Sequence, residues 1–116
     1  MEDLNTIYYN NFGIAFQWKP AATNDYKKVQ LVFRYTGLLL SMKELKGFSN
    51  SVNQTLENCT LCEDCKADET KRPLLVASPS EIVSFAMSYI EVEQVKDLLD
   101  GTIFHLNLDN MLDELI

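Results

Sequence analysis

The 116-residue sequence is poor in the residues that mark secreted and nucleotide-binding proteins, with only four glycines, three prolines, three cysteines and one histidine. All three cysteines lie within Cys59–Cys65, so no disulfide framework joins distant parts of the chain, and the pattern fits a reducing cytosol. Every glycine is isolated, which excludes the glycine-rich loops that cradle phosphates. The longest apolar runs, such as Leu74 to Ala77, are far too short to span a membrane.

The length and net charge of the chain limit its number of domains and its binding partners. The chain is long enough for one domain, residues 1–116, with a core that needs no disulfide or metal to hold it. Its net charge of −7 disfavours binding to nucleic-acid phosphates and to anionic lipid. The first residues carry two acids where a secretory signal has basic residues and an apolar run, so we expect a cytoplasmic protein. The sequence has no Gly-x-Ser-x-Gly elbow, and we expect no enzyme activity.

The first forty residues favour strands. Asn5 to Tyr9 and Ile14 to Trp18 are β-favouring runs separated by residues that tolerate positive φ, so a hairpin is expected. Val29 to Tyr35 alternates inward and outward positions with the period of two that is typical of a half-buried strand. Thr36-Gly37 is expected to break this run, and Leu38–Leu40 to form a further short strand.

A Ser-x-x-Glu capping box at Ser41–Glu44 predicts the start of a helix. The serine side chain can accept from the third helical N–H, while the glutamate reaches back to the serine N–H. Apolar residues then recur at spacings of three and four as far as Leu56. One side of a helix over 42–57 is therefore expected to face a core.

The stretch 79–100 allows two interpretations. Ser78 followed by proline is itself a helix start, so the whole stretch can form one helix. A second capping box at Ser88–Glu91 instead favours a strand over 82–87 and a helix that ends at Gly101. We favour the split because "LLLSMKEL" and "FAMSYIEV" are alike, each an apolar run that leads through Ser-x-x-Glu into a helix.

These elements predict an α+β fold, an antiparallel sheet with two amphipathic helices on one face. The matching junctions suggest a ββα-ββα pseudo-repeat. Pro73 to Ala77 supplies another strand, whereas 58–72 has almost no apolar content and is expected to form an exposed acidic loop that holds the cysteines. An extended segment over 102–108 and a helical turn over 109–116 are expected to complete the chain.

Several stretches, "IYYNNFGIAFQW", "VQLVF", "SMKEL", "SYIEVEQVKDLLDG" and "LDNMLDELI", resemble a family of small bacterial proteins known only as a domain of unknown function. The resemblance covers most of the chain and implies no activity. Many members carry a Cys-x-x-Cys just after the second strand, which implies an ancestral metal or redox site. The corresponding stretch here, Gln17–Pro20, has no cysteine, so that site is not expected at this position.

The stretch "CTLCEDC" is the clearest candidate for a site of chemistry. Cys59, Cys62 and Cys65 have the spacing of loops whose thiolates bind one zinc ion at about 2.3 Å each. Such a site needs a fourth ligand, either the only histidine or an acid of the same loop. The candidates are His105, Glu63, Asp64 and Asp68. The alternative is three exposed, reduced thiols with no cofactor.

Two other cysteine chemistries fit less well. A ferredoxin-type run needs a fourth cysteine and a proline, and the fourth position here is Glu69. A thiol–disulfide role for Cys62 and Cys65 needs a low thiol pKa, which the acids between them, Glu63 and Asp64, oppose.

The two remaining candidate groups are His105 and the aromatic residues. Strand alternation places His105 on a face with Ile103, so a surface strand residue is favoured over a ligand. Aromatic residues crowd the first third of the chain and are interpreted as the filling of a hairpin core. The alternative is a partner-binding surface, and the acidic charge then favours a protein over RNA. Its residues would be Tyr9, Phe12, Trp18 and Tyr26.

We therefore expect a small cytosolic binding or assembly module that acts through protein–protein contacts. Self-association is part of this expectation, since an open sheet leaves edges that a two-fold-related copy can cover. The alternative from another class is a small zinc-binding or thiol-redox protein that uses Cys59, Cys62 and Cys65.

Overall fold

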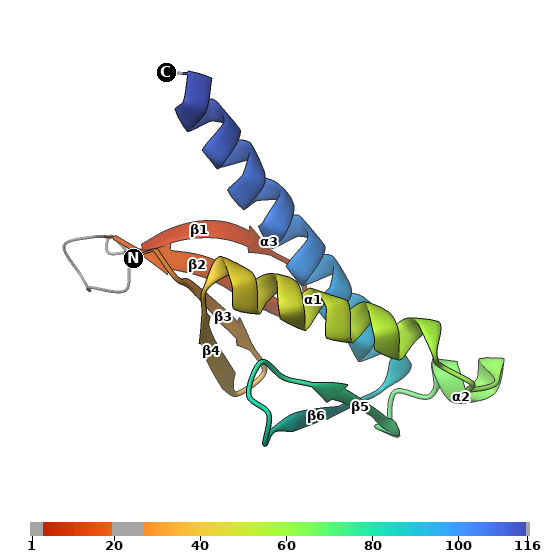
Figure 1. The fold of residues 1–116 in the computed structure, drawn as a ribbon. Coiled ribbons are helices and arrows are strands. Elements are labelled where there is room, and N and C mark those ends of the chain that lie inside the picture. The colour runs from red at the N-terminus through yellow and green to blue at the C-terminus, as the bar shows by residue number, and fades with distance from the viewer. Residues whose placement is uncertain (1–3, 20–26, 116) are drawn as a thin grey trace.

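A computed structural model describes residues 4–19 and 27–115. They form a four-stranded antiparallel sheet in the order β1-β2-β3-β4, a two-stranded sheet β5-β6, and three helices (Figure 1). The predicted α+β class is confirmed. The elements are β1 (Leu4–Tyr9), β2 (Gly13–Trp18), β3 (Val29–Phe33), β4 (Thr36–Leu40), α1 (Met42–Glu57), α2 (Glu63–Ala67), β5 (Leu74–Ala77), β6 (Ser84–Met87) and α3 (Tyr89–Leu115).

The four-stranded sheet is a meander of three hairpins, and the first of them matches the predicted one. The turn between β3 and β4 comes earlier than expected. It lies at Arg34–Tyr35, where Arg34 takes a positive φ of 53°, while Thr36 and Gly37 pair with β3. A two-residue hairpin turn requires positive φ, and Arg34 accepts it at a small energetic cost.

Both predicted capping boxes are present. The backbone N–H of Glu44 donates to Ser41 Oγ over 3.2 Å, and the Ser41 N–H donates to Glu44 Oε1 over 3.0 Å. At the start of α3 the N–H of Glu91 donates to Ser88 Oγ over 3.2 Å, and the Ser88 N–H donates to Glu91 Oε1 over 2.8 Å. The chain therefore splits into β6 and α3 as predicted, and β3-β4-α1 and β5-β6-α3 share the same order.

Helix α3 is longer than predicted. It passes through Gly101 without a break and continues to Leu115, so the predicted stop, the extended segment 102–108 and the separate turn after it are wrong. Gly101 has another role. A Cβ atom there would lie 2.6 Å from Tyr8 Cδ2 and closer still to two more ring atoms, so the glycine admits the ring rather than ending the helix.

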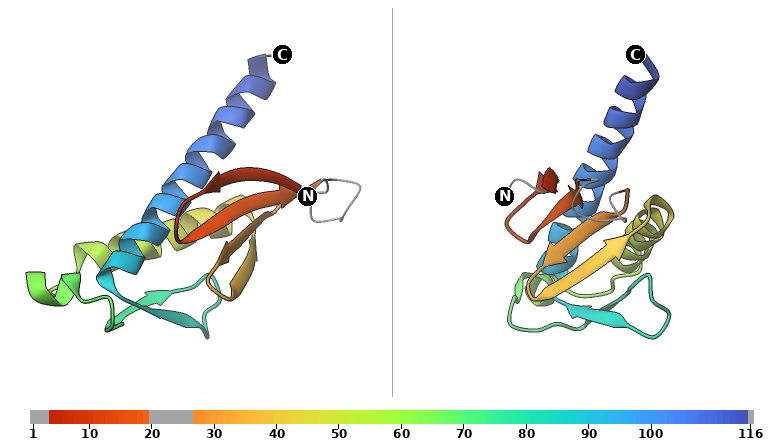
Figure 2. Two further views of the ribbon diagram at one scale, coloured as in Figure 1. Left: turned by 180° about the vertical axis from the view of Figure 1, so that it is seen from behind. Right: turned by 90° about the vertical axis from the view of Figure 1, so that its left-hand side faces the viewer.

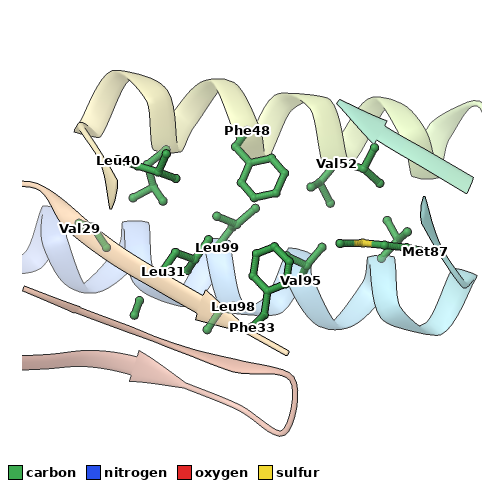
Figure 3. Packing of buried hydrophobic residues seen from close by; sticks show 14 of the residues in the cluster. Val29, Leu31, Phe33, Leu40, Phe48, Val52, Met87, Val95, Leu98 and Leu99 are labelled. Atoms are coloured by element: carbon green, nitrogen blue, oxygen red, sulfur yellow. The ribbon is translucent and has the colours of Figure 1, made fainter. Parts of the chain in front are cut away.

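Helices α1 and α3 pack against each other on one face of the four-stranded sheet (Figure 2). Inward residues of β3, such as Leu31 and Phe33, meet α1 residues, such as Phe48 and Val52, in a shared core (Figure 3). The β5-β6 hairpin extends this core, because Phe85 lies edge-on to Phe33 with ring centroids 5.4 Å apart. The predicted arrangement of two helices on one sheet face is confirmed.

The segment expected to be a loop is mostly irregular but contains α2, a single helical turn with no buried residue. Lys66 of α2 places its Nζ 5.0 Å from the ring centroid of Tyr89, in the first turn of α3. The loop is therefore held beside the start of α3. Over the part of the chain that the structure describes, no helix is long and apolar enough to cross a membrane.

Candidate functional site

The face of the four-stranded sheet that points away from α1 and α3 is apolar. Alternation along each strand turns residues such as Leu31 and Phe33 into the core and their neighbours outward. The outward residues form what we name the outer sheet face. They are Leu4, Thr6, Tyr9, Ile14, Phe16, Trp18, Gln30, Val32, Gly37 and Leu39. Among these described strand positions there is no charged residue.

Neighbouring strands line up these outward residues in rows. Ile14 lies between Tyr9 and Val32, and the next row carries Phe16 beside Gln30. The rings of Phe16 and Trp18 meet edge to face with centroids 5.3 Å apart. The β2 and β3 members are half-buried, and none of them is among the residues that pack against the core.

An uncovered antiparallel sheet face is ordinarily polar, because alternation separates a core side from a solvent side. Here the outer sheet face has only Thr6 and Gln30 as polar side chains, and Tyr9 remains 71% exposed. Removing apolar area of this kind from water is favourable by about 25 cal/mol per Å². The face is therefore suited to contact with another apolar surface.

The structure places only some of the aromatic residues predicted to bind a partner in the outer sheet face. Tyr9 and Trp18 both lie in the outer sheet face. Phe12 does not, because its ring stacks on that of Phe33 with centroids 5.3 Å apart and Arg34 lies 5.8 Å over it. Tyr26 lies outside the described residues.

Sequence reasoning missed most of the outer sheet face. Ile14, Val32 and Leu39 belong to it, yet none of them is among the aromatic residues that the sequence singles out. A signal was present, because the outward positions of β2 are all large and apolar (Ile14, Phe16 and Trp18), while β3 turns Val29, Leu31 and Phe33 inward. A sheet with apolar residues on both faces indicates two covered faces.

The three cysteines do not form one cluster of described side chains. Cys59 is half-buried and lines a depression of about 470 Å³ between the end of α1 and β5, whereas Cys62 and Cys65 are exposed. Within 4–19 and 27–115, no group of three or more His, Cys, Asp and Glu side chains is placed to hold a metal ion. The zinc site stays a prediction.

His105 is placed far from the cysteine loop. It lies on α3 rather than on the expected strand, and its ring stacks on that of Tyr8 with centroids 5.8 Å apart. The loop contacts α3 at Tyr89, and His105 lies sixteen positions further along the helix, about 24 Å away. The structure therefore does not bring His105 to Cys59, Cys62 or Cys65.

Cys62 and Cys65 interact with each other. Cys62 is the N-cap of α2, and its Sγ accepts the backbone N–H of Cys65 over 3.4 Å. Hydrogen bonding from the Cys65 side chain, then from the Cys65 N–H, lowers the pKa of the Cys62 thiol, and the same pairing raises the pKa of Cys65. Cys62 is therefore the more reactive thiol of the pair, and Cys65 the less reactive one.

A buried carboxylate at the start of α3 also binds side chains from the β3-β4 turn and from the segment before β5. Glu91 is 6% exposed, and its Oε1 accepts from Arg72 Nε over 3.0 Å as well as from the Ser88 N–H. Its Oε2 forms an ion pair with Arg34 of the β3-β4 turn. A hollow of about 240 Å³ opens beside this cluster. Because both arginines are engaged by Glu91, we regard the cluster as structural.

Comparison with protein-family models, with curated proteins and with solved structures found no match for this chain. The resemblance to a small bacterial family therefore stays a prediction.

Proposed function

We propose that this protein is a small cytosolic binding module, not an enzyme, and that it assembles through protein–protein contacts at the outer sheet face. The observation that carries the proposal is the apolar, uncharged character of that face on a sheet whose other side already holds the core. Free thiols at all three cysteines support a reducing compartment such as the cytosol.

We propose a second copy of the chain as the occupant. With a net charge of −7, the protein repels its own copy over most of its surface. The outer sheet face carries no charge, so two such faces meet without like-charge repulsion. Two sheets pack face to face at about 10 Å, and a two-fold axis makes one self-complementary patch sufficient.

The test is the oligomeric state as a function of concentration, measured by analytical ultracentrifugation. Phe16→Glu places a charge in the middle of the outer sheet face. Ile82→Glu is the matched control, because Ile82 lies in the β5-β6 turn with 93% exposure. We expect the wild type and Ile82→Glu to associate as concentration rises, and Phe16→Glu to stay monomeric with an unchanged circular dichroism spectrum.

Trp18 provides a second readout, because it is the only tryptophan and lies in the outer sheet face. Its emission should shift to shorter wavelength when the face is covered. A second variant, Leu39→Glu, guards against a folding defect peculiar to Phe16. A wild type that stays monomeric, or association that both outer-face variants retain, would overturn the proposed self-association.

A thiol-redox function is the second candidate, favoured by the pairing of Cys62 with Cys65. The Cys62 thiolate would attack a substrate disulfide and release one thiol, and Cys65 would then displace the second thiol and close a Cys62–Cys65 disulfide. A small dithiol must reduce that disulfide for turnover. Reduction of a model disulfide by catalytic amounts of protein with dithiothreitol tests this role, and equal rates for the wild type and Cys62→Ser would exclude it.

A further inference from the structure

The two-stranded sheet has a free edge on its β5 side. Ser78 and Val83 continue the register of the β5-β6 hairpin, and the Ser78 N–H donates to the Val83 carbonyl oxygen over 3.2 Å. Opposite residues of antiparallel strands bond to each other only in alternate pairs, so the next bonded pair begins at Val76. The main-chain groups of Leu75 and Ala77, which belong to the other pairs, therefore point away from β6.

These outward groups of β5 have no partner in the described part of the chain. Neither the N–H nor the C=O of Leu75 or Ala77 bonds to any of residues 4–19 and 27–115. Sheets ordinarily protect such an edge with a charged residue, a proline or a β-bulge. Strand β5, Leu74–Ala77, has none of these. Its edge is therefore a template for one more strand.

The depression of about 470 Å³ that holds Cys59 lies beside this edge and provides room for such a strand. Its other wall is α1, because β5 is the strand of the hairpin that packs beside α1 (Figure 1). The volume falls within the range of about 300–1,000 Å³ that is usual for ligand sites. A groove between a helix and a strand edge suits an extended peptide, which pairs with the strand through its main chain.

The two walls of the depression differ in polarity. Leu75 and Ala77 supply exposed apolar side chains on the β5 wall. The α1 wall supplies hydroxyl groups and the carboxamides of Gln54 and Asn58, which make no hydrogen bond with a described residue. None of the described residues that line the depression is charged, so a charged side chain buried there would lack a counter-charge. The lining favours a segment that alternates apolar residues with uncharged polar ones.

We propose that the depression between α1 and β5 binds an extended peptide segment of a partner protein by strand addition. The segment would pair with the outward main-chain groups of Leu75 and Ala77. Its apolar side chains would lie beside Leu75, and its polar side chains would face Gln54 and Asn58. Symmetrical pairing with β5 of a second copy fits poorly, because each strand would bring its own α1 to the same edge. This groove is separate from the outer sheet face and goes beyond the proposed self-association.

The probe is a synthetic peptide of about six residues, the usual length of a strand, in which threonine alternates with valine. A second peptide of the same sequence is N-methylated at the amides that would face β5, so it keeps the side chains and loses those main-chain donors. Each peptide is titrated into the isotope-labelled full chain, and the amide signals are followed by NMR. We expect the unmodified peptide to shift the Leu75 and Ala77 signals most and to slow their hydrogen exchange. The N-methylated peptide should bind at least about tenfold more weakly.

Two matched proline variants on opposite edges of the β5-β6 hairpin locate the site. Ala77→Pro removes an outward N–H of β5, whereas Ala86→Pro removes an outward N–H of β6. Proline is tolerated at such edge positions, because neither N–H takes part in the pairing of the two strands. We expect Ala77→Pro to weaken binding of the unmodified peptide at least about tenfold, and Ala86→Pro to leave it unchanged.

Cys59 gives an independent readout, because it is half-buried and lines the depression, whereas the exposed Cys62 does not line it. Bound peptide should slow the alkylation of Cys59 by iodoacetamide and leave the alkylation of Cys62 unaffected. Both thiols belong to the same chain, so the ratio of the two rates, measured by peptide mass spectrometry, serves as an internal control.

Several outcomes would overturn the proposal. No binding of the unmodified peptide at millimolar concentration, or equal affinity for the two peptides, would do so, and neither result requires a variant to fold. Equal effects of the two proline variants, or protection of Cys62 instead of Cys59, would also contradict it. Concentration-dependent association that Ala77→Pro abolishes would assign the edge to a second copy instead. Phe16→Glu is predicted to bind the peptide normally, so failure of the proposed dimer and failure of this inference are distinguished.

Discussion

The ring of Tyr8 in β1 lies directly on Gly101 in the middle of α3. The same ring stacks on His105, and its hydroxyl donates to both oxygens of the Asp97 carboxylate over 3.1 and 3.2 Å. Asp97, Gly101 and His105 follow one another at spacings of four and so form one line along the helix. One tyrosine therefore attaches the edge strand of the sheet to α3 over about two helical turns.

The first prediction concerns Gly101→Ala. In a helix interior this change is favourable by about 1 kcal/mol, but here the new methyl group meets the Tyr8 ring. We expect destabilisation of about 1–3 kcal/mol, measured by urea unfolding. In a Tyr8→Ala background, the same substitution should become stabilising.

Gly47→Ala is the control for this cycle, since nothing lies within 4 Å of a Cβ at Gly47 in α1. It should stabilise both backgrounds by up to about 1 kcal/mol. A Gly101→Ala effect that is the same with and without the Tyr8 ring would show that the contact does not explain the glycine.

The second prediction concerns alkaline pH. The hydrogen bond to Asp97 is the main cause that raises the pKa of Tyr8 above its ordinary value of 10.0, with burial and the Asp97 charge adding to it. Because the folded pKa exceeds the unfolded one, this stabilisation is complete below about pH 10 and is lost as the pH rises through the folded pKa.

The measurement is the free energy of unfolding of the wild type and of Tyr8→Phe across the alkaline range. The difference between them should shrink as the pH rises above 10. Asp97→Asn should bring the phenol absorbance change of Tyr8 to lower pH. A Tyr8 phenol that titrates at or below its ordinary pKa would contradict the prediction.

The third prediction concerns Glu91. Its removal leaves Arg34 and Arg72 without their shared carboxylate and leaves the Ser88 N–H without its acceptor. We expect Glu91→Ala to destabilise the protein by about 2–3 kcal/mol, because it removes charge-assisted hydrogen bonds while the half-exposed arginines become hydrated. Glu44→Ala removes only the exposed hydrogen bond that the glutamate accepts from the Ser41 N–H and should destabilise the protein clearly less. Equal losses in thermal unfolding would show that the arginine pairs contribute nothing.

The fourth prediction concerns thiol reactivity. Because the Cys65 side chain and N–H lower the pKa of Cys62, Cys62 should be the first cysteine alkylated by iodoacetamide as the pH is raised. Cys65→Ala removes the larger cause and should move the reaction to higher pH. Peptide mass spectrometry identifies the modified site. Preferential reaction at the half-buried Cys59, or an unchanged profile in Cys65→Ala, would refute the assignment.

The cysteine stretch shows how far local sequence reasoning reaches. The spacing of Cys62 and Cys65 indicates two thiols able to meet, and the intervening acids Glu63 and Asp64 predict a raised thiol pKa. The pKa of Cys65 is raised, chiefly by its hydrogen bond to Cys62 and also by the charge of Asp64, whereas the pKa of Cys62 is lowered by the hydrogen bonds from Cys65. The hydrogen bond between the two thiols, which the sequence does not specify, decides the direction at Cys62.

Short-range sequence signals were sufficient to predict where most helices and strands begin and end. Capping boxes at Ser41 and Ser88 involve atoms within four residues of one another, so they could be read from the sequence before any tertiary contact was known. Strand alternation in Val29–Phe33 likewise identified the inward residues. The α+β order and the placement of two helices on one sheet face followed from these local signals.

Tertiary contacts decided what the local signals could not. A β-bulge sets Ile7 and Tyr8 together opposite Ala15, and both residues pack against the core. Simple alternation would put Tyr8 on the other face. That bulge carries Tyr8 to Gly101, where a residue that locally signals a helix end instead provides room for a distant ring. Whether a glycine ends a helix or makes room for a neighbouring side chain depends on the residues packed against it, and only the tertiary structure determines those residues.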